Sequence, residues 1–280
     1  MPRVHRHENA ASFLDRAGAW LLGAEAEHNL ILGVARRLQG APEATDPPTY
    51  LATVEDGDEV VGCALRTPPH KLLLTHMPVA AIPALVEDVG KTEDRIPAVL
   101  GPEPEAVAFA RLRVETRGGS WRLGMRQRLH QLQRVTPPAR PPAGHMLLAE
   151  AEDIDLVTEW IGAFTVEVNA NDTPPAREWA ERAVSNHGVF LWEDRGPVSM
   201  TVRAGATPSG IRITGVYTPL DKRRRGYASA LVARVSQHLL DGGARFCILY
   251  TDVANATSNH IYGEVGYRPV CDIIDVELEE

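Results

Sequence analysis

The spacing of apolar positions predicts a helical region followed by strands in the first part of the chain. Apolar residues recur at helical intervals over residues 11–38, where one break is allowed. Apolar runs at 50–54 and 60–66 flank the polar turn EDGD, which predicts a hairpin. Residues 72–75 form a third apolar run and are a candidate third strand.

The same order of elements returns about 140 residues later. Helical spacing is found at 152–164 and at 175–186, and strand patterns at 189–192, 198–204 and 211–218. A helix is predicted from Gly226 to Gly242-Gly243, and a strand at 246–251. These patterns indicate a divergent internal duplication, with helices and then a hairpin in each copy.

A proline-rich segment, TPPARPPAG at residues 136–144, separates the two patterns. Four prolines in nine residues can continue neither a helix nor a central strand. We interpret this segment as a linker between domains at 1–135 and 145–280; a rigid surface loop within one domain is the alternative. The predicted fold class is α/β of the α+β type.

Composition excludes several classes of protein. Apolar residues make up 44% of the 280 residues, enough for a core, and no apolar run is long enough for a membrane span. The net charge of -8 lies wholly in the second half, where 20 acidic residues face 12 basic ones, which disfavours nucleic-acid binding. Three scattered cysteines suggest neither a disulfide framework nor a metal site, and we expect a cytoplasmic protein without a metal.

One basic segment stands out in the acidic half. Lys222 and three arginines precede Gly226, between a predicted strand and a predicted helix. Backbone N–H groups and the helix dipole make such a junction an anion site. The alternative is a solvated basic turn without a ligand.

A second motif makes the first more specific. After the strand at 246–251 come Asn255, Ser258, an Ile261-Tyr262 pair and a Gly266-Tyr267 pair. Together with Arg223-x-x-Gly226-x-Ala228, this segment resembles the acyl-CoA site of the GCN5-related N-acetyltransferase (GNAT) superfamily. The resemblance covers about residues 145–280 and implies a tandem member whose amino-terminal copy is degenerate, so that each domain is a mixed, mostly antiparallel sheet flanked by helices.

The resemblance also implies roles for individual residues. Tyr262 protonates the leaving CoA thiolate, a role that suits a hydroxyl which is neutral at pH 7; a core aromatic is the alternative. The loop binds the CoA pyrophosphate, the strand edge pairs with pantetheine, and Asn255 binds the same arm. The cofactor-binding residues are thus Val216, Tyr217, Thr218, Arg223, Arg224, Arg225, Gly226, Tyr227, Ala228, Asn255 and Ser258.

Two features depart from the family pattern. Arg224 stands where the loop has its second glycine, and Ala228 stands at the last glycine position. The first half has no matching loop, and near the corresponding place it reads Val89 to Arg95. We therefore expect acetyl-CoA to bind only in the second half.

The predicted reaction is transfer of an acetyl or short acyl group from CoA to an amine in a ternary complex. Glu167 and Asp252 are candidate general bases, although both can be ordinary surface charges. The acidic second half suggests a small-molecule or peptide amine, cationic in character, as the acceptor. A non-catalytic acyl-CoA sensor is the main alternative, and the oligomeric state stays open.

Overall fold

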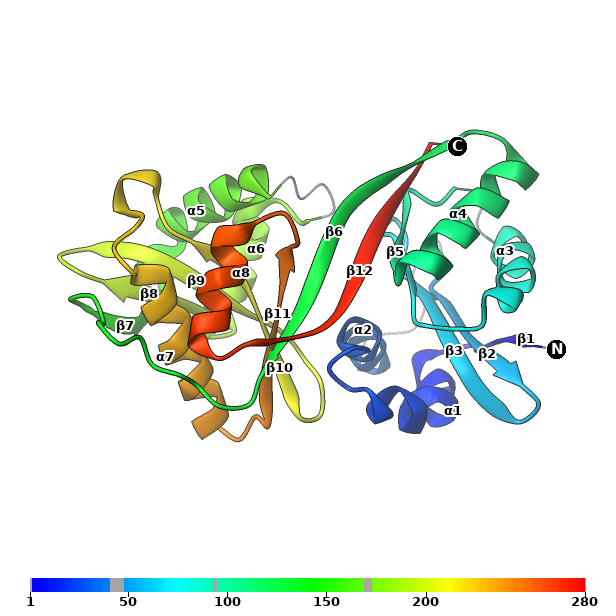
Figure 1. Cartoon of the computed structure of the whole chain (residues 1–280), viewed down its shortest axis with the longest axis horizontal. Helices are drawn as coiled ribbons and strands as arrows, with labels where there is room; N and C mark the ends of the chain where they lie inside the picture. Colours follow the sequence, from blue (N-terminus) through cyan, green and yellow to red (C-terminus); the bar gives the residue numbers. More distant parts are fainter. Residues whose placement is uncertain (1, 41–47, 93–94, 169–172, 280) are drawn as a thin grey trace. The chain divides into compact units, whose positions relative to one another are not determined.

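The computed structural model describes residues 2–40, 48–92, 95–168 and 173–279, and these residues form two compact units. Unit 1 comprises Met1–Arg128, Asp252–Ala254 and Cys271–Glu280. Unit 2 comprises Leu129–Thr251 and Asn255–Val270. Two strands, β6 (Ser120–Leu132) and β12 (Arg268–Glu279), run from one unit into the other along the sequence (Figure 1).

The sheet of unit 1 has the strand order β1-β2-β3-β4-β5-β12. All neighbours are antiparallel except β4 and β5. The strands before β12 are β1 (Arg3–Arg6), β2 (Tyr50–Asp56), β3 (Glu59–Arg66), β4 (Leu72–Leu74) and β5 (Ala98–Gly101).

Alternation along β2 explains the layers of unit 1. Tyr50, Ala52 and Val54 enter a core with α3 (Ile82–Gly90) and α4 (Glu103–Arg117). Leu51 enters a second core with α1 (Ala10–Gly23) and α2 (Asn29–Gln39). Because successive side chains of a strand point to opposite faces, each face of the sheet is covered by its own helix pair.

The sheet of unit 2 has the strand order β7-β8-β9-β10-β11, and only β10 and β11 are parallel. Its strands are β7 (His145–Leu148), β8 (Val189–Glu193), β9 (Pro197–Ala206), β10 (Gly210–Tyr217) and β11 (Phe246–Asp252). Its helices are α5 (Ile154–Glu167), α6 (Ala176–Ser185), α7 (Tyr227–Asp241) and α8 (Ala256–Val265).

Alternation along β8 divides the core of unit 2 in the same way. Val189 and Leu191 pack with α5 and α6, whereas Phe190 and Trp192 pack with α7 and α8. The element order of unit 2 repeats that of unit 1, including a short 3-10 helix before the third helix: η1 (Val79–Ala81) and η3 (Leu220–Lys222). The predicted fold class, two mixed and mostly antiparallel α/β domains, is confirmed.

The boundaries of the two compact units differ from the domain boundaries expected from the sequence, 1–135 and 145–280. Residues 129–135 group with unit 2, and the last strand groups with unit 1, where Ile274 and Val276 of β12 pair with β5 and enter its core. The proline-rich segment 136–144 lies within unit 2. Among the described helices, none combines the length and the apolar character needed to cross a bilayer.

Candidate functional site

The ends of β10 and β11 form the floor of the candidate site in unit 2. Their parallel pairing joins Gly210–Arg212 to Phe246–Ile248 and goes no further within the described residues. Both strands nevertheless continue, β10 to Tyr217 and β11 to Asp252. Gly215, at φ +60°, lies in an irregularity of the β9–β10 register, where only glycine adopts the backbone without strain. The last part of β10 therefore presents a strand edge that β11 does not cover.

The loop after β10 leads into the amino terminus of α7. Gly226 precedes α7 in a left-handed conformation (φ +81°), and no side chain caps the helix. Arg224 is also left-handed (φ +62°), at the position where the family pattern has glycine. The N–H groups at the start of a helix have no acceptor within it. The loop thus leaves several N–H groups available for an anion.

The Arg223 side chain connects this loop to the residue after β10 and to α5 through two polar contacts. Its Nε donates to the Thr218 carbonyl at 2.8 Å, and its Nη2 forms an ion pair with Glu167 Oε2 at 2.5 Å. Glu167 is the last residue of α5, and about half of its side chain is exposed. The structure therefore brings this candidate base to the loop before α7, where it contacts the Arg223 guanidinium.

The proline-rich segment packs along unit 2 beside the same loop. The Thr136 N–H donates to the Val265 carbonyl at 2.8 Å, and the Ala143 carbonyl accepts the Trp192 indole N–H at 2.9 Å. A Cβ built on Gly226 would lie 3.8 Å from Pro142 Cδ. Both ends of the segment are thus fixed to unit 2.

Tyr262 lies on α8 with its side chain in the core of unit 2. It shares that core with Tyr227 of α7, and Val216 of β10 packs against the same cluster. Only 8% of Tyr262 is exposed, and burial raises the pKa of its hydroxyl well above the ordinary value. Within the described residues the hydroxyl has no hydrogen-bond partner. The Tyr262 hydroxyl is therefore protonated, and it donates no hydrogen bond to a described residue.

Asn255 caps α8, because its Oδ1 accepts the Ser258 N–H at 3.0 Å. This bond uses the carbonyl oxygen of the amide and leaves its NH2 group for another partner. Asp252 ends β11, where its Oδ1 accepts the Ala254 N–H at 2.8 Å, and residues 252–254 group with unit 1. Of the two candidate bases, Glu167 contacts the loop through its ion pair with Arg223.

Unit 1 has a different loop at the corresponding topological place. It follows β4 and spans residues 75–81, whereas Val89 and Gly90, suggested by the sequence, lie in α3. The Met77 N–H donates to Glu105 Oε1 at 3.2 Å, and His76 Nδ1 lies 3.1 Å from the same oxygen. Sequence analysis missed this pair, because 29 residues separate His76 from Glu105.

The strands on either side of that loop in the sequence, β4 and β5, stay paired to their ends, in contrast to β10 and β11. Leu73 pairs with Leu100 at the ends of β4 and β5. A Cβ on the next residue of β5, Gly101, would lie 2.8 Å from the Leu74 carbonyl oxygen. No room for an extended ligand arm exists there between the two backbones.

Comparison with known proteins agrees with this geometry. Residues 148–270 match the family model described as an acetyltransferase (GNAT) domain. A search of curated proteins finds no significant match.

Several solved structures share the whole fold. A GCN5-related N-acetyltransferase from Sphaerobacter thermophilus is 16% identical, with a TM-score of 0.65 over 99% of this chain and 95% of its own. A tandem GNAT protein from the clavulanic acid biosynthesis pathway is 14% identical, with a TM-score of 0.58 over 99% and 98%. A GNAT-family acetyltransferase from Colwellia psychrerythraea is 11% identical, with a TM-score of 0.59 over 99% and 100%. At these identities the likeness establishes the fold. The chain therefore has the fold of a tandem GNAT protein, and its residues 148–270 match the GNAT acetyltransferase domain model.

Proposed function

We propose that unit 2 transfers an acetyl or short acyl group from CoA to an amine. The separation of β10 from β11 beyond Arg212 and Ile248, next to the loop before α7, is the observation that carries this proposal. An acyl-CoA needs one place for a diphosphate and another for an amide-containing arm. The loop offers backbone N–H groups, and the uncovered edge of β10 offers strand-like hydrogen bonds to the arm.

The cofactor would lie along elements that are already in contact. Pantetheine runs beside Val216, Tyr217 and Thr218, with the NH2 group of Asn255 as a further donor. The pyrophosphate accepts N–H groups from the loop residues Arg224, Arg225, Gly226, Tyr227 and Ala228. The left-handed backbone at Arg224 and Gly226 supports this role, because such conformations turn successive N–H groups toward one point.

The chemical step is a direct displacement. The amine nitrogen attacks the thioester carbonyl, and a backbone N–H of the separated strand stabilises the oxyanion. The C–S bond then breaks, and the thiolate takes the proton of the Tyr262 hydroxyl, which solvent later restores. The ammonium proton leaves through Glu167, Asp252 or water. Burial supports the role of Tyr262, since its raised pKa keeps the donor protonated.

Two measurements test the proposal. Calorimetric titration of the full chain with acetyl-CoA should give one site per chain, because in unit 1 the strands stay together and Glu105 occupies the Met77 N–H. No binding at millimolar ligand refutes the proposal, and two sites refute the assignment to unit 2 alone.

The second measurement follows thiol release during an amine screen. Tyr262→Phe should lower kcat about 100-fold and leave the Kd for acetyl-CoA unchanged, because only the proton donor is lost. Tyr267→Phe is the matched control: its ring packs edge-on against Tyr262, but its hydroxyl is bonded to Ser236. Tight acetyl-CoA binding without turnover of any amine would favour the non-catalytic sensor instead.

A further inference from the structure

A pocket of about 800 Å³ opens in unit 1 beside the loop that follows β4. Its walls come from α1, the β2–β3 turn, β3, the loop itself and the start of α4. In unit 2 the corresponding loop is the proposed pyrophosphate site. Ends of adjacent parallel strands are common ligand sites in α/β folds, so this pocket is a candidate site in its own right.

This loop lacks the positive charge of the loop in unit 2. Residues 75–81 read THMPVAA and contain no lysine, arginine or glycine, whereas residues 222–226 read KRRRG. Pro78 has no N–H, and the N–H of Met77 already donates to Glu105. An anionic ligand would have to displace an internal carboxylate here. The pocket therefore calls for a cation.

Glu105 places an incompletely paired carboxylate at this pocket. Its side chain is 5% exposed and helps to line the pocket. Both hydrogen bonds, from Met77 and His76, reach Oε1, and Oε2 has no partner among the described residues. A buried carboxylate is costly unless donors or a positive charge compensate it.

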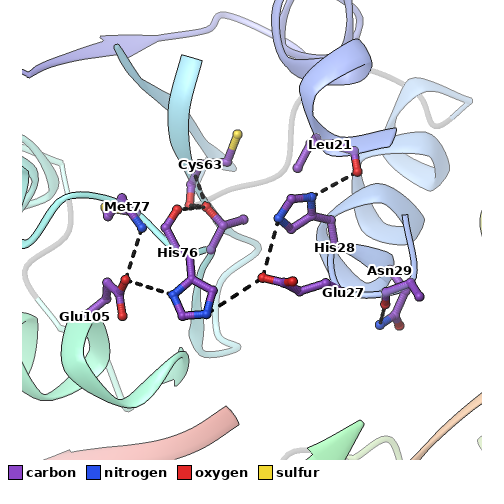
Figure 2. Close-up of polar contacts among 10 residues, drawn as sticks. Leu21, Glu27, His28, Asn29, Cys63, His76, Met77 and Glu105 are labelled. Carbon is purple, nitrogen blue, oxygen red and sulfur yellow. Dashed lines mark hydrogen bonds and ion pairs between the residues drawn. The ribbon is translucent and has the colours of Figure 1, made fainter. Parts of the chain in front are cut away.

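Figure 2 shows His76 between Glu105 on one side and Glu27 with His28 on the other. His28 donates from Nδ1 to the Leu21 carbonyl at 2.9 Å, and burial lowers its pKa, so its Nε2 carries a lone pair. When neutral His76 donates from Nδ1 to Glu105, its Nε2 is an acceptor as well. Glu27 Oε1 lies 3.9 Å from each of these two Nε2 atoms, too far for a hydrogen bond.

An ammonium group suits these three acceptors. It has three N–H donors, and acceptors held at about 2.9 Å by one tetrahedral nitrogen lie roughly 4–5 Å apart, compared with 3.9 Å from Glu27 Oε1 to each Nε2 atom. A metal ion suits them less well, because in the described ranges no three His, Cys, Asp or Glu side chains have a metal-binding arrangement.

The remaining pocket wall is partly apolar, with the side chains of Trp20, Val60, Val61, Met77, Pro78 and Ala19. Arg16, Asp58 and Glu59 line it as well, and the Arg16 guanidinium is paired with Glu55 and with the Asp58 carbonyl. The Trp20 ring stacks on His28, with centroids 4.7 Å apart, which fixes the indole in place. Indole faces attract organic cations.

We propose that unit 1 binds a small primary ammonium compound with an apolar body, whose charged end is held by Glu27, His28 and His76 beside the Glu105 carboxylate. Every residue involved belongs to unit 1. The proposal is therefore independent of acyl transfer in unit 2.

The test is a titration of the full chain with 2-phenylethylammonium near pH 8. Isothermal calorimetry and ligand-detected NMR should show one saturable site. The isosteric probes 2-phenylethanol and 3-phenylpropionate should bind at least about tenfold more weakly, because they lack the positive charge. Equal binding of the neutral or anionic probe, or no saturation by about 10 mM ammonium, overturns the proposal.

Variants locate the site. Glu105→Gln keeps an acceptor for Met77 but removes the charge, and should weaken ammonium binding at least about tenfold. His76→Gln removes the imidazole acceptor and should weaken ammonium binding as well. Because the His76 side chain is 56% exposed, this substitution should leave the fold intact. Glu115→Gln, on the exposed side of the same helix, is the matched control and should bind as the parent does.

Two other outcomes contradict the proposal. Loss of binding in Glu167→Gln with full binding in Glu105→Gln would place the cation in unit 2. Zinc binding that depends on His76 and Glu105, in the absence of ammonium binding, would make the pocket a metal site. Neither result changes the acetyl-CoA stoichiometry. The proposed function of unit 2 is therefore tested separately.

Discussion

At the scale of single residues, Arg224 shows how this loop departs from its family pattern. Its backbone is left-handed, a conformation that costs a non-glycine residue about 1 kcal/mol or more. Its exposed guanidinium has no partner among the described residues. The left-handed backbone therefore fixes the direction of the Arg224 N–H group. The Arg224 side chain is free to contact solvent or a ligand.

Arg224→Gly should raise the free energy of unfolding by about 1 kcal/mol, since glycine adopts this backbone without strain. If the N–H groups bind the pyrophosphate, the acetyl-CoA Kd should change by less than about threefold. Urea unfolding and calorimetry measure the two quantities. A tenfold loss of affinity would assign phosphate binding to the guanidinium. Arg223→Gly is the contrasting variant, because its backbone is extended and its side chain is paired.

At the scale of elements, the ion pair between Glu167 and Arg223 links the end of α5 to the cofactor loop. A half-exposed pair of this kind contributes at most about 1 kcal/mol to stability. Its effect should therefore lie in the position of the loop more than in the stability of the fold. Glu167 thus has two candidate roles, which kinetics can distinguish: it holds the loop in position through Arg223, or it accepts the proton of the amine.

We expect Glu167→Gln to raise the KM for acetyl-CoA several-fold and to leave kcat near the parent value, because the loop loses its brace. Steady-state kinetics over a range of pH measures both constants. A large fall in kcat, with loss of the acidic limb of the pH profile, would instead identify Glu167 as the general base. Glu178→Gln on α6, which removes another exposed ion pair, is the control.

At the scale of the whole molecule, the carboxy-terminal strand contributes to the unit formed by the first half of the chain. Ile274, Val276 and Leu278 enter the core of unit 1, and β12 pairs with β5. Burying each of these side chains contributes about 1.5–3 kcal/mol. Their sum is comparable to the total stability of a typical domain.

Deletion of residues 271–280 should therefore unfold unit 1, although it leaves residues 1–128 intact in sequence. Limited proteolysis should cut the truncated chain first within those residues. Deletion of residues 279–280 alone removes no core residue and serves as the control. Persistence of a protease-resistant unit 1 in the longer deletion would show that β12 is dispensable.

A second prediction for the whole molecule concerns alkaline pH. Burial raises the pKa of the Tyr50, Tyr262 and Tyr267 hydroxyls and of the Cys63 and Cys247 thiols. The native state keeps these protons above pH values at which the unfolded chain releases them. Stability is therefore fully present below the unfolded pKa values, about 8.5 for Cys and 10 for Tyr, and falls above them.

Urea unfolding should show a stability that is flat near neutral pH and declines from about pH 9, more steeply above about pH 10. Each buried group contributes a slope of about 1.4 kcal/mol per pH unit. Tyr267→Phe should reduce the slope above pH 10 by that amount. A constant stability up to about pH 11 would contradict the assigned burial.

Features that depend on neighbouring residues were predictable from the sequence. Periodicity placed the first two helices and the hairpin of each unit, and the predicted start of α7 at Gly226 agrees with its cap. The loop and the Asn255 to Tyr267 motif were recognisable because their residues are close in the chain. Helical spacing, turn chemistry and capping are local properties, so one segment suffices to read them.

Features that depend on contacts between distant residues appeared only in the tertiary structure. No local pattern indicated that β12 would join unit 1, that β4 and β5 would stay together while β10 and β11 separate, or that Glu105 would meet His76. The sequence by itself determined the fold class, the duplicated order of elements and the acyl-CoA motif. The tertiary structure decided which strand completes which core and which side chains share a pocket, because these follow from packing between segments far apart in the chain.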